Sequence, residues 1–189
     1  MAKLTLNFAD AAFASNFDAV PAGEYRCLIE SANMDISKSG NPTCSVMFSI
    51  LDEDPDVKGR KIFNNVFTLV DAAMFTVPRT LKSLNIPYKE VGFPFSLEGN
   101  AEEGFVYEGM LVGEKDAKGK NPFLGFVLGN GKVYPLVDNI VNVNVTVVTL
   151  AGREDPSNNV TSFSIVGEPI VRDNAPANVN SGQRSGDLV

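Results

Sequence analysis

The chain has 189 residues, of which 44% are hydrophobic and 21% charged, and its formal net charge is −7. This length and composition are typical of one globular domain with a full hydrophobic core, and they exclude wholesale disorder. The absence of histidine removes the commonest general base, the usual serine and cysteine triads and most transition-metal sites. We therefore expect a protein that is not an enzyme and that uses no cofactor or metal.

The first 20 residues are expected to form an N-terminal arm. Asp10 and Asp18 interrupt its apolar residues, so it does not have the pattern of an export signal, and no other segment is long and apolar enough to cross a bilayer. This predicts a soluble protein that is not exported. Cys27 and Cys44 fall inside predicted strands without metal-ligand spacing, which predicts buried, reduced thiols.

Three strands are predicted in the first third of the chain. Residues 23–34 and 43–51 have the apolar and polar alternation of strands, and the Gly40–Asn41–Pro42 turn between them predicts a hairpin. A third strand is predicted at about 59–69 from its β-branched and aromatic residues.

A helical segment is predicted next. Asp71 can cap a helix, Pro78 must either kink it or begin a second short turn, and the segment ends before Pro87. The apolar residues of this segment include Met74, Phe75, Leu81 and Leu84.

The signals weaken between residues 91 and 137, where we expect an inserted β-ribbon with a tight turn at Asn130–Gly131 and a loop-like stretch at 93–105. Residues 139–150 then alternate strictly, and 159–170 follow as a last strand. The polar residues 172–189 predict a disordered tail.

Three strands, a helix and two further strands are the order of an OB-fold. We therefore predict a mainly β protein built on a five-stranded Greek-key barrel, with its helix between strands three and four. The OB-fold domain would span residues 21–171, with the insertion at about 91–137.

The third strand combines positive charge with aromatic rings in an acidic protein. Residues 58–89 hold six basic residues against the single acid Asp71. Such a strand suits a groove that tracks a nucleic-acid backbone while rings stack on bases. Its candidate contacts are Lys58, Arg60, Lys61, Phe63 and Phe67. Two alternatives stay open: the Phe rings belong to the core, and the cations are ordinary solvated charges.

A second basic and aromatic segment lies in the insertion. Lys115, Lys118 and Lys120 precede Phe123 and Phe126 in a loop punctuated by Gly and Pro. This segment is either a finger that reaches over a bound strand or a solvated hairpin tip whose Phe residues fold back on the barrel.

Several ordered motifs resemble a known family. They are "PAGEY" (21–25), "SKSGNP" (37–42), "FSILDE" (48–53), "KGRKIFNNV" (58–66), "LKSLNIP" (81–87) and "AGRED" (151–155). Together they resemble a family of phage proteins, encoded among replication and recombination genes, that are regarded as OB-fold single-stranded DNA-binding proteins. The resemblance covers 21–87 and 138–170, whereas 91–137 departs from the family's compact pattern.

The resemblance implies a strand-binding groove and a cellular setting. The groove would lie near Tyr25, Arg26, Lys38, Arg60, Lys61 and Phe63. The protein would work in the cytoplasm of an infected bacterial host. Its partners would be single-stranded DNA and, through the tail, replication or recombination proteins; self-association stays open and no membrane is involved.

The predicted function is therefore sequence-tolerant binding of single-stranded DNA in phage replication or recombination. Two other classes stay open. One is a structural or protein-interaction module, such as a virion component or an inhibitor of a host protein. The other is a histidine-free enzyme that acts on nucleic acid with carboxylate-bound Mg²⁺.

Overall fold

The computed structural model describes residues 18–149, 151–152 and 155–173, which form a mainly β protein with antiparallel sheets. β1 (Gly23–Ile36) and β2 (Pro42–Ile50) form the predicted hairpin, and β3 (Lys61–Thr68) pairs with the other edge of β2. β9 (Ile140–Val148) pairs with the first half of β1, and β10 (Ser157–Ile165) pairs with β9. The strand order is therefore β10-β9-β1-β2-β3.

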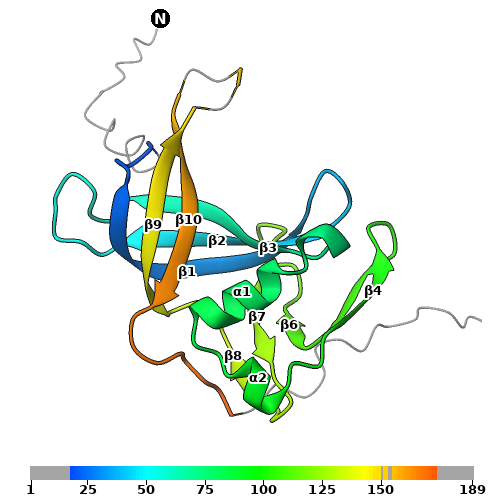
Figure 1. Ribbon diagram of the computed structural model, residues 1–189. Coiled ribbons are helices and arrows are strands. Elements are labelled where there is room, and N and C mark those ends of the chain that lie inside the picture. Colours follow the sequence, from blue (N-terminus) through cyan, green and yellow to red (C-terminus); the bar gives the residue numbers. More distant parts are fainter. Residues whose placement is uncertain (1–17, 150, 153–154, 174–189) are drawn as a thin grey trace, which may run out of the picture.

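These strands form two crossed layers, with the core between them. In Figure 1 the β9–β10 hairpin crosses in front of β1, β2 and β3. The Phe48 ring of β2 meets the Phe163 ring of β10 between the layers, with centroids 5.9 Å apart. Cys27 and Cys44 are buried free thiols in this core, as predicted. Burial raises the pKa of Cys27 to about 12 and also raises that of Cys44, so both thiols stay protonated at neutral pH.

The sheet does not close into a barrel. Among the described residues, β10 pairs only with β9 and β3 only with β2, so the closed barrel expected from the sequence is wrong. Each of these edge strands carries a bulge, in which Val66 of β3 and Thr161 of β10 have no partner in the register. A bulge bends its strand and increases the local twist. We attribute the gap between the two edges to this bending.

The helical segment lies beside that gap. It consists of a 3₁₀ turn (Asp71–Ala73), α1 (Thr76–Ser83) and α2 (Tyr88–Val91). Pro78 is the third residue of α1, where a missing N–H costs no helical hydrogen bond, so the second of the two predicted roles of this proline is correct. The predicted cap is wrong, because Asp71 lies within the 3₁₀ turn and the turn has no side-chain cap.

The insertion contains β4 (Ser96–Asn100), β5 (Gly104–Glu108), β6 (Met110–Val112), β7 (Asn121–Val127) and β8 (Val133–Tyr134). β4 and β5 form a two-stranded sheet, in which β4 lies within the stretch 93–105 that was predicted as a loop. β7 pairs with the second half of β1, at Asn33 and Met34, so the insertion extends the main sheet. The predicted turn at Asn130–Gly131 is confirmed, with Gly131 at a φ of 73°.

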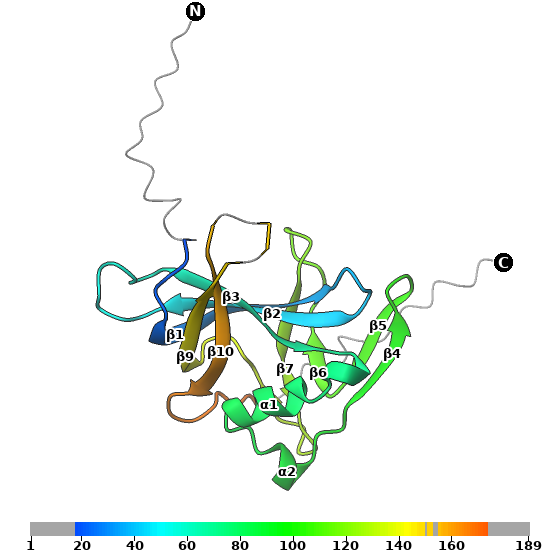
Figure 2. The ribbon, with the colours of Figure 1, turned by 45° about the horizontal axis from the view of Figure 1, so that its top comes forward.

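An aromatic cluster attaches the insertion to the core. The Phe67 ring of β3 lies 5.6 Å from that of Phe123 and 5.7 Å from that of Phe126, both on β7. Phe93 contacts Phe126 from the segment after α2. Figure 2 shows β6 and β7 beside the main sheet and the β4–β5 hairpin projecting from it. The insertion is therefore packed against the rest of the molecule through buried rings.

The ends of the chain lie largely outside the described residues. This holds for most of the predicted arm at 1–20 and of the predicted tail at 172–189. Arg172 itself is described, and it exchanges two backbone hydrogen bonds with Val133 of β8. None of the described helices has the length and apolar character needed to span a membrane.

Candidate nucleic-acid interface

The side of β1, β2 and β3 that points away from the core carries three cross-strand rows, which we call the outer face. The pairing places Leu28 beside Ser49 and Lys61, Ser31 beside Met47 and Phe63, and Asn33 beside Ser45 and Asn65. Phe63 is 56% exposed in the middle row. The outer face thus has an aromatic and thioether centre with polar rows on both sides.

Cations lie at both ends of this face. Arg26 is exposed near the start of β1, and Arg60 lies just before β3. At the other end Lys120, from the insertion, reaches Asp35 of β1 with an Nζ–Oδ1 distance of 3.2 Å. Nine residues of strand separate Arg26 from Asp35, which corresponds to about 30 Å. This length suits several nucleotides of an extended single strand.

A carboxylate lies on this face at the bulge in β1. Glu30 has no partner in the register between Ile29 and Ser31, and it lies on the same side as Arg26 and Leu28, whereas the alternation is shifted by one residue from Ser31 onward. Its carboxylate forms an ion pair with Lys61, whose ammonium also donates to the Ser49 hydroxyl at 3.0 Å. Lys61 is therefore held in place across all three strands.

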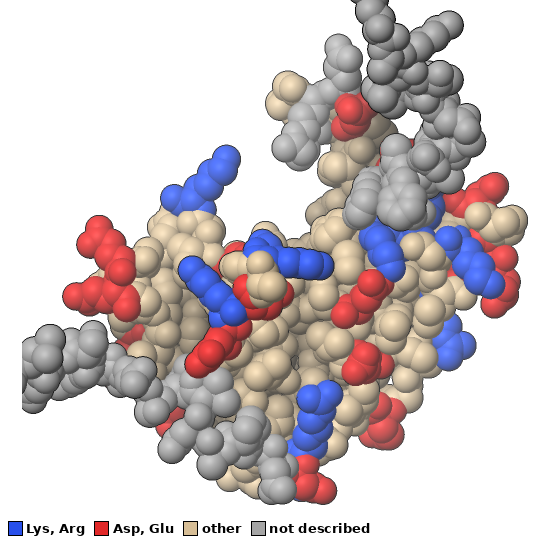
Figure 3. Space-filling view, turned by 180° about the vertical axis from the view of Figure 1, so that it is seen from behind, with Lys and Arg blue, Asp and Glu red and all other residues tan. Residues whose placement is uncertain are grey.

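Carboxylates accompany four of the eight predicted cations. Lys58 pairs with Glu53 at 2.6 Å and Arg60 with Asp18 at 3.9 Å, in addition to the pairs of Lys61 and Lys120. The hydrogen bond from Lys58 lowers the pKa of Glu53. In the view from behind, Lys and Arg are interspersed with Asp and Glu, without a single-sign patch (Figure 3). The positive charge of the basic segment is thus partly compensated.

Four other predicted cations have no carboxylate within ion-pair distance in the described part of the chain. They are Arg26, Lys38, Lys115 and Lys118. Lys38 lies exposed in the β1–β2 turn. Lys115 and Lys118 lie exposed in the β6–β7 loop, where the Asp116 carboxylate accepts from the Lys118 and Lys120 amides, both at 2.8 Å. These cations lie around the outer face rather than on it.

Two of the predicted stacking rings are core residues. Phe67 is 1% exposed and Phe123 is 2% exposed, and the two rings pack against each other. The bulge at Val66 explains the error for Phe67, because one extra residue moves the residues after it to the other face of the strand. For Phe123 the alternative holds, since its segment folds back on the core. Neither ring can stack on a base in this structure.

Tyr25 is also separated from the outer face. It precedes Arg26 in β1, and neighbouring residues of a strand point to opposite sides. Its ring packs against the core, and its hydroxyl donates to the Pro21 carbonyl at 2.7 Å. Desolvation, followed by the charges of Asp52 and Asp54, raises the pKa of Tyr25. Tyr25 therefore has a structural role in this arrangement.

The sequence reasoning missed several residues of the outer face. Met47 and Ser45 alternate with the core residues of β2, so their position was visible in the sequence, but neither residue is charged or aromatic. Asn33 and Asn65 become neighbours of Ser45 only through the strand register. The position of such polar, uncharged residues on a binding face becomes visible only when the pairing of the strands is known, and amino-acid composition does not reveal it.

Comparison with known proteins gives one family. A family model described as a protein of unknown function (DUF669) matches residues 6–104, which is more than half of the chain. The matched segment includes the whole of β1, β2 and β3, and therefore the entire outer face. No curated protein matches the chain.

Proposed function

The chain belongs to the DUF669 family, and we propose that it binds single-stranded DNA on the outer face with little sequence preference. The observation that carries this proposal is the exposed Phe63 ring, which lies in the middle row of the face between rows of polar and charged side chains. Stacking on a ring tolerates every base, since every base has a π-face, and it contributes about 1–3 kcal/mol per base.

The strand order supports an OB-fold as the scaffold. β1 pairs with both β2 and β9, and α1 lies between β3 and β9 in the chain. These are the neighbours expected in the five-stranded, partly open Greek-key barrel of OB-folds, whose strand 2–3 face binds oligonucleotides. In this assignment β9 and β10 are strands four and five, and the β1–β2 turn with Lys38 borders the binding face.

We further propose that the protein acts in phage DNA replication or recombination. This setting is supported by the resemblance of the motifs at 21–87, which fall within the segment that the family model matches. A net charge of −7 disfavours indiscriminate binding to duplex DNA, because like charges repel over the rest of the surface.

Fluorescence anisotropy of labelled oligo-dT, titrated with the full chain at several salt concentrations, tests this function. We expect saturable binding that weakens with salt, as counterions are released, and that duplex of the same length does not displace. The same titration with oligo-U tests the preference for DNA. Lack of binding even at low salt would refute the proposal.

A protein-interaction module is the second candidate, and the ion pairs favour it. Lys58, Arg60, Lys61 and Lys120 all lie beside carboxylates, which lowers the positive potential available to a phosphate backbone. An exposed ring flanked by compensated charges also suits a protein surface. A stable protein complex together with no oligonucleotide binding would favour this candidate.

A further inference from the structure

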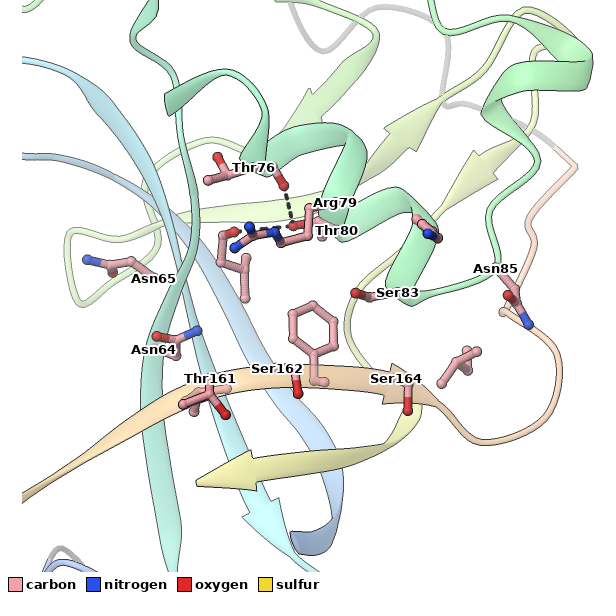
Figure 4. Close-up of a pocket in the computed structure, with 15 residues that line it drawn as sticks. Asn64, Asn65, Thr76, Arg79, Thr80, Ser83, Asn85, Thr161, Ser162 and Ser164 are labelled. Carbon is pink, nitrogen blue, oxygen red and sulfur yellow. Dashed lines mark hydrogen bonds between the residues drawn. The ribbon is translucent and has the colours of Figure 1, made fainter. Parts of the chain in front are cut away.

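A cleft of about 680 Å³ lies where the two edges of the sheet fail to meet (Figure 4). Its walls are the edge of β3 at Asn64–Val66, the edge of β10 at Val160–Ile165, and α1 together with Asn85. Volumes between about 300 and 1,000 Å³ are typical of small-molecule sites. The cleft shares only Asn65, at the edge of β3, with the rows of the outer face.

Hydrogen bonds between α1 and β3 hold one wall of the cleft in place. The buried Thr80 hydroxyl of α1 is 3.2 Å from the carbonyl of the bulge residue Val66 and 2.9 Å from the Thr76 carbonyl. The Thr76 hydroxyl accepts from the Thr68 amide of β3 at 3.4 Å. The contacts with Val66 and Thr68 hold α1 against β3 beside the gap between the two edges.

The charges of the cleft differ from those of the outer face. Arg79 and Lys82 of α1 line it, and no Asp or Glu is among its lining residues. The protein as a whole has a net charge of −7, and four of the cations around the outer face are paired with carboxylates. The cleft therefore has an excess of positive charge in an acidic protein.

Arg79 has an aromatic neighbour and no carboxylate partner in the described part of the chain. Its guanidinium lies over the Phe75 ring, with Cζ 5.1 Å from the centroid. This cation–π contact restricts the position of the guanidinium without neutralising its charge. Figure 4 shows Arg79 between α1 and β3, on the side of Asn64 and Asn65. Lys82 also borders a neighbouring hollow that contains Glu90 and Glu168, so Arg79 is the principal cation.

A polar donor and an aromatic ring complete the cleft. Asn64 points from β3 toward α1 in Figure 4, and in the described part of the chain its side-chain amide makes no hydrogen bond. Ser162 points instead toward β9, where its hydroxyl accepts from the Asn144 amide at 3.1 Å. Phe163 lines the same cleft and is partly buried.

We propose that this cleft binds a nucleotide phosphate. Arg79 and Lys82 would contact the phosphate, Asn64 would donate to its oxygens or to the sugar, and Phe163 would contact the base. Arg is well suited to phosphate because its planar fork donates two parallel hydrogen bonds. The phosphate belongs either to a free nucleotide or to a nucleotide within a strand. This inference does not depend on the function proposed for the outer face.

The test is a ¹H–¹⁵N NMR titration of the full chain with dTMP, pyrophosphate, thymidine and oligo-dT as separate probes. We expect dTMP and pyrophosphate to shift the amides of residues 64–66, 79–83 and 160–165, and thymidine to shift them far less. The double variant Arg79→Gln/Lys82→Gln should raise the Kd for dTMP about tenfold or more, through loss of charge-assisted hydrogen bonds. Lys89→Gln, which alters the neighbouring hollow but not the cleft, is the matched control.

Three results would overturn the proposal. They are no saturable shift up to millimolar dTMP, shifts that map elsewhere, and a double variant that is folded by its spectrum yet binds dTMP like the wild type. Equal binding of an acidic peptide would assign the cleft to a protein partner instead and would also overturn it. Oligo-dT shifts confined to the outer face, with dTMP in the cleft, would identify the free nucleotide as the source of the phosphate.

Discussion

Phe63 and Phe67 lie four residues apart on one strand and have opposite roles. Phe63 is 56% exposed, whereas Phe67 is 1% exposed and packs against two other rings. The bulge residue Val66 separates them and reverses the phase of the alternation. Removing either ring therefore changes a different property of the protein.

Phe63→Ala should weaken oligo-dT binding by about 1–3 kcal/mol, the range for one stacked base. Its free energy of unfolding should change by about 0.5 kcal/mol or less, because the ring is mostly exposed. Phe67→Ala should instead destabilise the fold by about 3–5 kcal/mol, through the cavity it leaves. Anisotropy titration and urea unfolding measure the two effects. Phe105→Ala, in the β4–β5 hairpin, is the binding control, and equal affinity of Phe63→Ala and wild type would contradict the stacking role.

Glu30 restrains the one lysine of the outer face that lies within β3. Glu30→Gln removes the carboxylate beside Lys61, so we expect tighter oligo-dT binding, by up to about 1 kcal/mol, and a steeper salt dependence. Anisotropy at several salt concentrations measures both quantities. Glu98→Gln, in the exposed β4 strand, removes the same charge away from the face and should have the smaller effect. Indistinguishable results for the two variants would argue against Lys61 as a phosphate contact.

The buried thiol of Cys27 predicts a loss of stability at alkaline pH. Its pKa is about 12 in the folded protein against 9.0 for an ordinary thiol. Between these values the unfolded chain releases the proton and the folded chain keeps it, so the free energy of unfolding falls as pH rises. The measurement is the unfolding midpoint from pH 8 upward. Cys27→Ala should reduce this fall, and an equal fall in the variant would show that Cys27 contributes little to it.

At the scale of elements, the strands were predictable and the bulges were not. The alternation and turn residues identified β1, β2, β3, β9 and β10 within a few residues of their bounds. The bulges at Glu30, Val66 and Thr161 have no Gly or Pro to mark them and follow from how the strands twist against one another. The error at Phe67 follows from the bulge at Val66.

The β4–β5 hairpin shows a second limit of sequence reasoning. Ser96–Asn100 is mostly exposed and contains a Gly and a charged residue, which is a loop composition. The hairpin forms through pairing of the two segments, with Leu97 and Tyr107 facing the core side. A strand with a weak apolar pattern is recognised only when its partner is known.

The buried Thr80 hydroxyl of α1 lies between the Val66 carbonyl of β3, at 3.2 Å, and the Thr76 carbonyl of its own helix, at 2.9 Å. Thr80→Val keeps the shape of the side chain but removes this donor from both carbonyls, which should cost about 1–3 kcal/mol of unfolding free energy. Urea denaturation measures the change. Ser83→Ala, which also lies on α1 but has no hydrogen bond from its hydroxyl in the described residues, should cost about 0.5 kcal/mol or less. Equal stabilities of the two variants would exclude a structural role for the Thr80 bond.

At the scale of the whole molecule, the sequence predicted the order of the main elements but not the closure of the sheet. A mainly β protein with a helix between its third strand and the β9–β10 pair is confirmed. Closure depends on whether β3 and β10 approach within hydrogen-bonding distance, and the twist added by their bulges decides this. The cleft and its residues, including Arg79, were therefore not predicted from the sequence.

The structure also shows that the charge of the basic segment is partly neutralised by ion pairs. The basic segment looked like an uncompensated +5 in the sequence, but acids from β1 and from the segments before β1 and β3 pair with it in space. We therefore expect stacking to contribute more of the affinity, and phosphate contacts less, than the charge of the basic segment alone indicates. In the proposed complex a single strand of DNA lies on the outer face, across Phe63.

The most direct test of this claim is photo-crosslinking of the full chain to oligo-dT that carries iodo-deoxyuridine at successive positions, followed by mass spectrometry of the peptides. If the strand lies across Phe63, we expect crosslinks to Phe63 and to its neighbours on β2 and β3. These crosslinks should disappear in Phe63→Ala. Crosslinks that map only to other surfaces, or a yield that duplex DNA reduces as strongly as unlabelled oligo-dT, would contradict it.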